Sequence, residues 1–447
     1  MNIPRIMFAA PASGSGKTLI TCGILQALVN RKMKVSSFKC GPDFIDPKFH
    51  ERVIGTTSGN IDLFLGGTET SKYLFGRTAE HSDISVVEGV MGFYDGIGNT
   101  IDASSYDVSS KLNIPVVLVV DGRGSSTSAA ATAKGFLEFR KNNIKGVIIN
   151  NTNEKVYQGL KPIIEKELGL KAIGYVPKVK ELVIESRHLG LIMPHEIDAL
   201  KEKLIKLAET LERTLDIDEI VHIASSAGEF SYKAPKFPKK VKVRIGVAKD
   251  DCFCFIYNNN IELLERLGAE IVYFSPLHDK QIPKDIGGLI IPGGYPELFA
   301  DALSRNKKML ADIGRSVRNG IPCMAESGGF MYLHKELEDA AGKYCKMAGI
   351  IDGKAFRTEK LSKFGYHTYT AMNDGLMPEG TVIRGHEFHY WDSTACGDDC
   401  DAVRPSGGQH KCMHNTENIF AGFPHMYYYS NPDSLYQFLK RSAAYLG

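Results

Sequence analysis

Small residues, a lysine and a threonine stand together near the N-terminus, in the segment PASGSGKT at residues 11–18. The segment follows a strand-like run and precedes a helix-like run, which is the context of a phosphate-binding loop. In such a loop the backbone N–H groups around Ser15 and Gly16 approach phosphate oxygens, Lys17 supplies a cation, and the Thr18 hydroxyl can bind Mg²⁺. A plain Gly/Ser-rich turn is the alternative. Pro11 stands where the common pattern has its first glycine, so the segment predicts a variant loop.

Four carboxylates follow in two segments that Gly and Pro break up. Asp43 and Asp46 lie in KCGPDFIDPKFH, and Glu88 and Asp95 stand near the two ends of EGVMGFYDG. Such carboxylates can hold Mg²⁺ or orient an activated substrate, and a strand-end acid such as Glu88 commonly faces a nucleotide-bound metal. Turn-capping aspartates are the alternative for Asp43 and Asp46.

Two further segments of the first half carry polar groups that could contact a ligand. Asn150 and Asn151 end another strand-like run, where an amide side chain can pair with the edge of adenine or form an ordinary turn. The segment RHLGLIMP at residues 187–194 could bring an arginine and a histidine to substrate carboxylates, or hold a structural salt bridge.

The second half contains the parts of an acyl-transfer site. In PGGYPELF at residues 292–299, a glycine turn follows a buried run and could present N–H groups of an oxyanion hole, with Gly294 and Gly328 as its members. Ser327 lies where the strand-like IPCMA runs into ESGGF, a strand-to-helix elbow that exposes a nucleophile. His425, in GFPHMYYY, is the candidate base, although a lone histidine is more often structural. RGHEFHY at residues 384–390 adds titratable groups that could line a substrate site or an interdomain seam.

The elements that must position these residues form two α/β series. Apolar runs at residues 3–9, 34–39, 84–88, 116–120 and 146–150 alternate with amphipathic stretches, which predicts a parallel sheet covered by helices. A stretch rich in Ser, Gly, Pro and Lys follows, and a second series has strand-like runs at residues 243–248, 270–274, 288–291 and 322–325. We therefore expect an N-terminal domain over residues 1–224, a linker over 225–241 and a second α/β domain over 242–447.

Composition narrows the class of protein. With 447 residues, 43% of them hydrophobic, and a net charge of +2, the chain is large enough for two domains and gives no sign of a nucleic-acid or membrane partner. The N-terminus lacks a secretory pattern, and the nine cysteines show no disulfide spacing, so we expect a cytoplasmic protein with reduced thiols. Cys396, Cys400 and Cys412, with His410 and His414, could form a metal cluster, but surface-loop residues are the preferred interpretation.

Taken in order, the motifs PASGSGKT, KCGPDFIDP, VVEGVMGFYDG, IPGGYPELF, AESGGFMYL, RGHEFHY and the final His425 resemble those of the cobyrinic acid a,c-diamide synthase family over nearly the whole chain. The resemblance implies a dethiobiotin-synthetase-like P-loop ATPase domain fused to a class I glutamine-amidotransferase-like domain. It implies the use of ATP, Mg²⁺ and glutamine to amidate the c and a carboxylates of a corrin ring through an acyl phosphate. Carried over by motif, Lys17 and Thr18 hold nucleotide and metal, Glu88 supports the metal, and Asp43, Asp46 and Asp95 serve substrate or phosphate.

One position departs from the family pattern, because Ser327 stands where family members carry the elbow cysteine. A glutaminase of this class needs a thiolate, and serine has a far higher pKa. Cys323 cannot replace the thiol, since it should still lie in the buried strand. We therefore predict impaired glutaminase activity, in an ammonia-dependent natural variant, an engineered inactive form, or an enzyme whose Ser–His pair still works.

Two other functions remain open on the sequence alone. Nickel-sirohydrochlorin or another sirohydrochlorin-derived tetrapyrrole would demand the same chemistry as the corrin substrate. A nucleotide-switch ATPase with an inactive amidotransferase domain is a hypothesis of another class, although it would not obviously need Asp43, Asp46 and Asp95. A homodimer is a further expectation, since isologous contact is common among such enzymes.

Overall fold

The computed structural model describes residues 1–178 and 197–447, so the segment 187–194 considered above lies outside the described residues. The chain separates into two compact units, Met1–Pro235 and Lys236–Gly447. The boundary falls inside the predicted linker, where residues 230–242 form neither helix nor strand.

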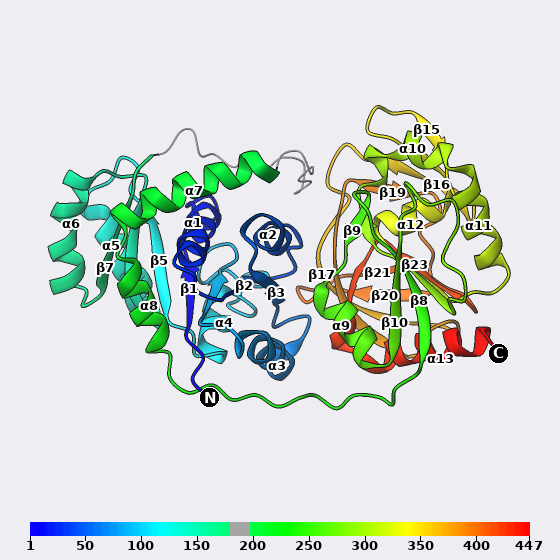
Figure 1. The fold of residues 1–447 in the computed structure, drawn as a ribbon, viewed down its shortest axis with the longest axis horizontal. Coiled ribbons are helices and arrows are strands. Elements are labelled where there is room, and N and C mark those ends of the chain that lie inside the picture. Colours follow the sequence, from blue (N-terminus) through cyan, green and yellow to red (C-terminus); the bar gives the residue numbers. More distant parts are fainter. Residues whose placement is uncertain (179–196) are drawn as a thin grey trace. The chain divides into compact units, whose positions relative to one another are not determined.

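The first unit is built on a seven-stranded sheet with the order β3-β2-β4-β1-β5-β6-β7, and all six pairings are parallel (Figure 1). The predicted parallel sheet is confirmed. All five strands predicted for this half are present, and the sequence interpretation missed β3 and β7. The strands are β1 (Arg5–Ala9), β2 (Val35–Cys40), β3 (Thr57–Ile61), β4 (Ile84–Glu88), β5 (Val116–Asp121), β6 (Ile144–Asn150) and β7 (Lys171–Val176).

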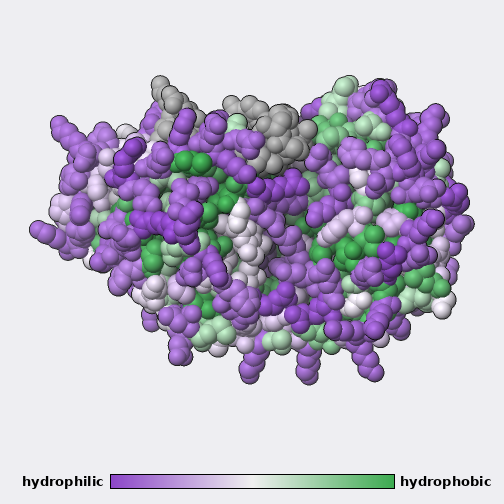
Figure 2. Space-filling model, viewed as in Figure 1, coloured by the Kyte–Doolittle hydropathy of each residue, from purple (hydrophilic) through white to green (hydrophobic). Residues whose placement is uncertain are grey.

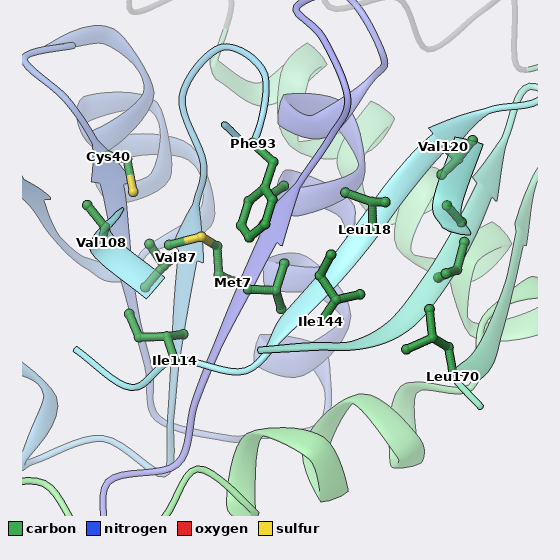
Figure 3. Packing of buried hydrophobic residues seen from close by; sticks show 14 of the residues in the cluster. Met7, Cys40, Val87, Phe93, Val108, Ile114, Leu118, Val120, Ile144 and Leu170 are labelled. Atoms are coloured by element: carbon green, nitrogen blue, oxygen red, sulfur yellow. The ribbon is translucent and has the colours of Figure 1, made fainter. Parts of the chain in front are cut away.

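Helices cover both faces of this sheet because its buried strands are apolar on both sides. The described helices of the unit are α1 (Lys17–Asn30), α2 (Ile45–Phe49), α3 (Gly67–Ala79), α4 (Ser105–Lys111), α5 (Thr127–Phe139), α6 (Glu154–Lys166), α7 (Ile197–Thr214) and α8 (Ile217–Ser225), with a π-helical turn at His50–Ile54. Residues of β1 alternate between two cores. Met7 packs in the core formed with α3 to α6, and Phe8 packs in the core formed with α1, α7 and α8. Figure 3 shows Met7, Val87 and Leu118 from three neighbouring strands together with Phe93 and Val108 in the first of these cores.

A fully buried arginine joins the start of the sheet to the helices behind it. The Arg5 guanidinium donates to the carbonyl oxygens of Leu112 (3.1 Å), Ile3 (2.9 Å), Ala227 (2.9 Å) and Gly228 (3.2 Å). Burial lowers the pKa of Arg5 to about 10, so the group stays charged at neutral pH. The side chain therefore ties β1 to the segments that follow α4 and α8.

The second unit contains a six-stranded sheet with the order β10-β8-β11-β13-β23-β22, parallel except for the β22–β23 edge. The four strands predicted for this half are present as β8 (Val243–Ala248), β10 (Ala269–Phe274), β11 (Gly288–Ile291) and β13 (Cys323–Glu326); β22 (His414–Asn415) and β23 (Ile419–Gly422) complete the sheet. The helices are α9 (Asn258–Arg266), α10 (Ala300–Arg305), α11 (Lys307–Arg318), α12 (Gly328–Leu333) and α13 (Pro432–Tyr445).

Smaller sheets fill the region between α12 and α13, which the sequence interpretation left without strands. A four-stranded sheet joins β14 (His334–Glu338), β15 (Tyr344–Lys346), β16 (Ile351–Arg357) and β19 (Trp391–Ser393). A five-stranded sheet has the order β21-β20-β17-β18-β24, with β17 (Lys363–Ala371), β18 (Val382–His389), β20 (Cys400–Val403), β21 (Gln409–Cys412) and β24 (His425–Tyr427). β9 (Phe253–Phe255) and β12 (Gly293–Gly294) pair with each other in a separate two-stranded antiparallel sheet. These strands carry many polar residues, so they lack the apolar runs that reveal the parallel strands.

Hydrophilic side chains cover most of the face shown in Figure 2. Among the described helices, none combines the length and apolarity that a bilayer span requires.

Candidate active sites

The predicted phosphate loop connects the end of β1 to the start of α1. Gly14 and Gly16 both have positive φ (77° and 93°), a conformation that glycine adopts without strain. A side chain at Gly16 would overlap the Asn150 amide, whose Nδ2 donates to Ser15 O at 2.8 Å. Asn150 thus holds the loop from the end of β6. The Asn150 side-chain amide thus donates a hydrogen bond to the loop itself. Its contact with adenine remains a prediction.

Lys17 points its ammonium group at backbone oxygens of two glycine-rich segments. Its Nζ donates to Ala12 O (3.2 Å) and to Met91 O (2.6 Å), which joins the phosphate loop to the EGVMGFYDG segment. Burial, assisted by the positive charge of Lys39, lowers the pKa of Lys17. Carbonyl oxygens are weak partners for a buried ammonium group, so this cation is available to a more strongly charged anion.

Glu88 stands at the centre of a buried polar network at the end of β4. Its Oε1 accepts from Thr18 Oγ1 at 2.5 Å and from Lys39 Nζ at 2.7 Å, and Lys39 Nζ also lies 2.5 Å from Asp46 Oδ2. The structure therefore brings together Thr18 and Glu88, predicted to serve the metal, and Asp46, predicted to hold Mg²⁺ or to orient the substrate. Burial first, and then Asp46, raise the pKa of Glu88, while the ion pair with Lys39 opposes the shift.

Lys39 begins the motif KCGPDFIDP, but no role was predicted for it from the sequence. Burial opposes its charge, yet the carboxylates of Glu88, Asp46 and Asp43 raise the pKa of Lys39 well above its ordinary value. A lysine at the end of a buried strand, followed closely by two aspartates, is the signal that could have identified it.

His50 is a second residue that the sequence did not single out. Its Nε2 lies 3.9 Å from Glu88 Oε2, and burial lowers its pKa to about 4.

The other two predicted carboxylates make local backbone contacts. Asp43 Oδ1 accepts from Ile45 N at 2.7 Å, and Asp95 Oδ2 accepts from Gly92 N at 3.0 Å. The turn-capping alternative given for Asp43 thus holds for one of its oxygens, and Asp95 makes a similar contact that was not predicted. Burial and the nearby Asp46 raise the pKa of Asp43. The negative charge of Asp95 partly opposes the lowering of the Lys17 pKa by burial.

The donor set beside the phosphate loop fits a Mg²⁺ ion carried by a nucleotide. Oxygen ligands are what this cation takes, and Thr18, Asp46 and Glu88 supply a hydroxyl and two carboxylates. Within the described residues, the fully buried Glu88 Oε2 has no hydrogen-bond partner. A buried carboxylate oxygen without a hydrogen bond destabilises the folded state unless a cation or a metal-bound water reaches it.

In the second unit, Ser327 occupies a strained elbow between β13 and α12. Its backbone has φ 49° and ψ −111°, which costs a non-glycine residue about 1–3 kcal/mol. Its N–H donates to Gly422 O at 2.8 Å, and its carbonyl accepts from Met331 N at 2.9 Å. Ser327 therefore has the backbone of a nucleophile elbow, although the residue is a serine.

The glycine turn and the candidate base converge on this elbow. A Cβ on Gly328 would lie 3.0 Å from both N and O of Gly294, and a Cβ on Gly293 would overlap the His425 ring. The two glycines proposed for the oxyanion hole are thus neighbours. The glycine turn therefore contacts Gly328 through Gly294 and the His425 ring through Gly293, where a side chain would overlap the ring.

Several side chains to which the sequence assigned no catalytic role lie near His425 and the elbow. The His386 ring stacks on His425, with 5.2 Å between centroids, and burial lowers the pKa of His386 to about 4. Beside the elbow, Glu326 Oε1 accepts from Tyr428 Oη at 3.0 Å, and burial raises the pKa of Glu326 to about 8. His386 lies within the RGHEFHY segment, whose density of titratable groups was the available signal.

Two of the three cysteines near the C-terminus lie in strands and not in the surface loops that were expected. Cys400 and Cys412 are buried on the paired strands β20 and β21, so their assignment to surface loops was wrong. Cys396 Sγ donates to Asp392 Oδ1 at 3.2 Å. Among described residues, the side chains that gather with metal-ligand spacing are His367, Glu387 and His410, which leaves the cysteines out.

A phosphate-loop unit joined to a unit with a nucleophile elbow defines the class of nucleotide-dependent enzymes with an amidotransferase domain. Two family models agree with this division. Residues 6–191 match the CobQ/CobB/MinD/ParA nucleotide binding domain, and residues 244–432 match the CobB/CobQ-like glutamine amidotransferase domain. The predicted α/β fold of both halves is thereby confirmed.

The chain belongs to the cobyrinate a,c-diamide synthase family. It is 38% identical over 445 residues to the cobyrinate a,c-diamide synthase of Caldanaerobacter subterraneus, covering 98% of each chain. It is 40% identical to the synthase of Clostridium acetobutylicum (96% of this chain, 98% of the relative) and 40% identical to that of Fusobacterium nucleatum (95% and 97%). The resemblance predicted from the motifs is confirmed.

Proposed function

We propose that this protein is a ligase of cobalamin biosynthesis that amidates the a and c carboxylates of cobyrinate at the expense of ATP. The observation that carries the proposal is similarity over nearly the full length to proteins of that name, in a chain that retains the acidic network beside Lys17. The same similarity favours a ligase over a nucleotide switch, and cobyrinate over a sirohydrochlorin-derived ring.

The first unit activates the carboxylate in this proposal. ATP, bound with Mg²⁺, supplies the phosphoryl group that makes a substrate carboxylate into an acyl phosphate, from which ammonia displaces phosphate to form the amide. Lys17 and the N–H groups from Ser15 to Thr18 bind the phosphates. Thr18, Asp46 and Glu88 hold the metal, and Lys39 keeps Glu88 and Asp46 in place through its ion pairs. Asp43 and Asp95 orient the substrate carboxylate or the phosphoryl group.

The second unit supplies nitrogen in this proposal, with Ser327 as the nucleophile and His425 as the base. The N–H groups of Gly294 and Gly328 form the oxyanion hole. Because a hydroxyl needs a strong base to attack an amide, glutamine is used poorly, and free ammonia is the effective donor. We further propose a cytoplasmic homodimer. The nine cysteines form no disulfide bond within the described residues, which supports the compartment because reduced thiols are typical there.

The test is product formation from cobyrinate, ATP and Mg²⁺, followed by mass spectrometry with either glutamine or ammonium as the nitrogen source. We expect a diamide with ammonium and at most a trace with glutamine. Equal rates with both donors would show that Ser327 is a competent nucleophile. No amide with either donor, while a sirohydrochlorin-derived ring is amidated, would overturn the assignment of the substrate.

A further inference from the structure

Three potential metal ligands lie on one face of the five-stranded sheet in the second unit. His367 is on β17, Glu387 on β18 and His410 on β21. The register pairs His367 with Gly385 and Tyr369 with Ala402, and Ala402 in turn with His410. Residues directly opposite each other share a face, and so do residues two positions apart on one strand. All three side chains therefore project from the same face.

Small residues lie opposite all three side chains, and Gly365 leaves open space beside Glu387. Glu387 is opposite Gly365, His367 is opposite Gly385, and His410 is opposite Ala402. A Cβ on Gly365 would meet no atom within 4 Å. One potential ligand atom from each of His367, Glu387 and His410 lies within 4.8 Å of the others, and His410 Nε2 is 3.6 Å from Glu387 Oε1. Small side-chain rotations can thus bring the three atoms around one ion.

The tautomer of His367 leaves the lone pair that a metal requires, and one nitrogen of His410 has no hydrogen bond to break. His367 Nδ1 lies 3.2 Å from Gly365 O, and a carbonyl can only accept, so Nδ1 carries the proton and Nε2 has the lone pair. Arg404 Nε donates into that lone pair at 3.1 Å. His410 Nε2 is buried and has no hydrogen-bond partner among the described residues.

Two neighbouring side chains hold the carboxylate of the third ligand, Glu387, in place. Glu387 Oε1 accepts from Tyr369 Oη at 3.0 Å, and Oε2 lies 3.0 Å from His389 Nε2. These contacts orient the carboxylate as outer partners do in metal sites.

We propose that His367 Nε2, Glu387 Oε1 and His410 Nε2 form a site for a divalent first-row transition metal of the Zn²⁺ type. Two imidazoles and one carboxylate are a common ligand set for such ions and a poor one for Mg²⁺, which prefers oxygen. The ion takes the place of the exposed Arg404 side chain at His367 Nε2. This site is independent of the nucleotide-bound metal and of the proposed amidation. It joins β17, β18 and β21, and β18 carries His386 next to Glu387.

The test is metal binding by the full-length protein after removal of metals. Zn²⁺ affinity is measured by competition with a chromophoric chelator in excess Mg²⁺, and Co²⁺ is used to record visible ligand-field bands. We expect one Zn²⁺ per chain and Co²⁺ bands of a site with nitrogen ligands. In His410→Ala, and separately in His410→Gln, we expect affinity to fall at least about 100-fold. His81→Ala, which changes an exposed histidine of the first unit, should bind as the parent does.

Arg404→Ala is a second variant, for which we expect the opposite change in Zn²⁺ affinity. Because the guanidinium competes for His367 Nε2, its removal should tighten Zn²⁺ binding by about tenfold. Circular dichroism of each variant controls for misfolding, and His410 is partly exposed at the sheet edge, where substitution is tolerated best. Zn²⁺ binding that is unchanged in both His410 variants would overturn the proposal, as would weaker binding in Arg404→Ala.

Discussion

Ser327 combines the backbone of a nucleophile with a side chain of low reactivity. Its φ of 49° is the strained conformation that an elbow imposes, and the surrounding glycines at 293, 294 and 328 leave space only for the reacting group. Sulfur could therefore replace oxygen here without a change in the backbone. The thiolate of a cysteine, unlike a serine hydroxyl, is accessible near neutral pH when a histidine is close.

Ser327→Cys is expected to create efficient glutamine-dependent amidation. The rate with glutamine should rise on the order of 100-fold or more, because a thiol assisted by His425 replaces a hydroxyl of much higher pKa. The rate with ammonium should stay unchanged and serves as the control. A Ser327→Cys variant that gains nothing with glutamine would show that another part of this site is also defective.

Glu326, next to the elbow, makes the stability of the second unit depend on pH. Burial raises the pKa of this carboxyl to about 8 from an ordinary value near 4.5. Between those values the folded state holds a proton that the unfolded state has lost, so the free energy of unfolding falls as pH rises through this window. Glu326→Gln mimics the protonated acid and should remove this part of the dependence.

The measurement is urea unfolding followed by the fluorescence of Trp391, the single tryptophan of the chain, from about pH 5 to about pH 8. The parent should lose at most about 1.4 kcal/mol per pH unit more than Glu326→Gln. Glu417→Gln, at an exposed glutamate, should keep the parent's slope. Parallel curves for the parent and Glu326→Gln would contradict a protonated Glu326.

Residues in recognisable motifs could be predicted from the sequence, whereas their partners could not. Lys17, Thr18, Asp46 and Glu88 were named and are brought together, because adjacent parallel strands end at one edge of a sheet. Lys39 was missed, since only tertiary packing places its ammonium group between two acids. His386 and Tyr428 were missed for the same reason, because each meets its partner through strand pairing or packing across a long sequence separation.

At the scale of elements, the buried arginine at the start of β1 is a point of weakness. Arg5→Met would remove buried hydrogen bonds to the carbonyl oxygens of Leu112 and Ile3, while Ala227 O would keep its hydrogen bond from Asn113 Nδ2. We expect the free energy of unfolding of the first unit to fall by about 3 kcal/mol. Circular dichroism during urea unfolding measures the change, while Trp391 fluorescence reports the second unit and should not shift.

Arg31→Met is the matched control for that experiment. Arg31 also binds acceptors on other helices, Glu212 at 2.7 Å and Asp218 at 2.6 Å, but at the surface. Exposed ion pairs contribute little, so this variant should lose only about 0.5 kcal/mol. Equal losses in Arg5→Met and Arg31→Met would show that burial of the Arg5 guanidinium is not decisive.

Buried parallel strands could be predicted as elements, and the antiparallel ones could not. A strand covered by helices on both faces reads as a continuous apolar run, as in VVLVVD of β5. KFGYHTYTA of β17 and QHKC of β21 mix charged, polar and aromatic residues. β17 pairs with β18 and with the more distant β20, whereas β21 pairs with the nearby β20, so the mixed composition of these strands is what hides them.

At the scale of the whole molecule, activation and nitrogen supply belong to different units and should fail separately. Lys17→Ala should lower amide formation at least about 100-fold with either ammonium or glutamine, because the phosphates lose a preorganised cation. In the double variant Lys17→Ala/Ser327→Cys, hydrolysis of glutamine should persist although no amide forms. Measuring glutamate release and diamide in the same reaction checks this. Amide formation by Lys17→Ala with ammonium would remove Lys17 from the activation step.

The connection between the units has a further consequence for handling the protein. Tyr232 is held by Glu80 at 2.6 Å, and the Phe237 ring packs on Tyr429 and Arg266, so both ends of the intervening stretch are anchored. Lys233 and Lys236 lie exposed between these anchors, in backbone without helix or strand. Trypsin is expected to cleave there, since proteases require an extended, accessible chain. A cleavable junction at this place would allow one half to be isotopically labelled and rejoined to an unlabelled half.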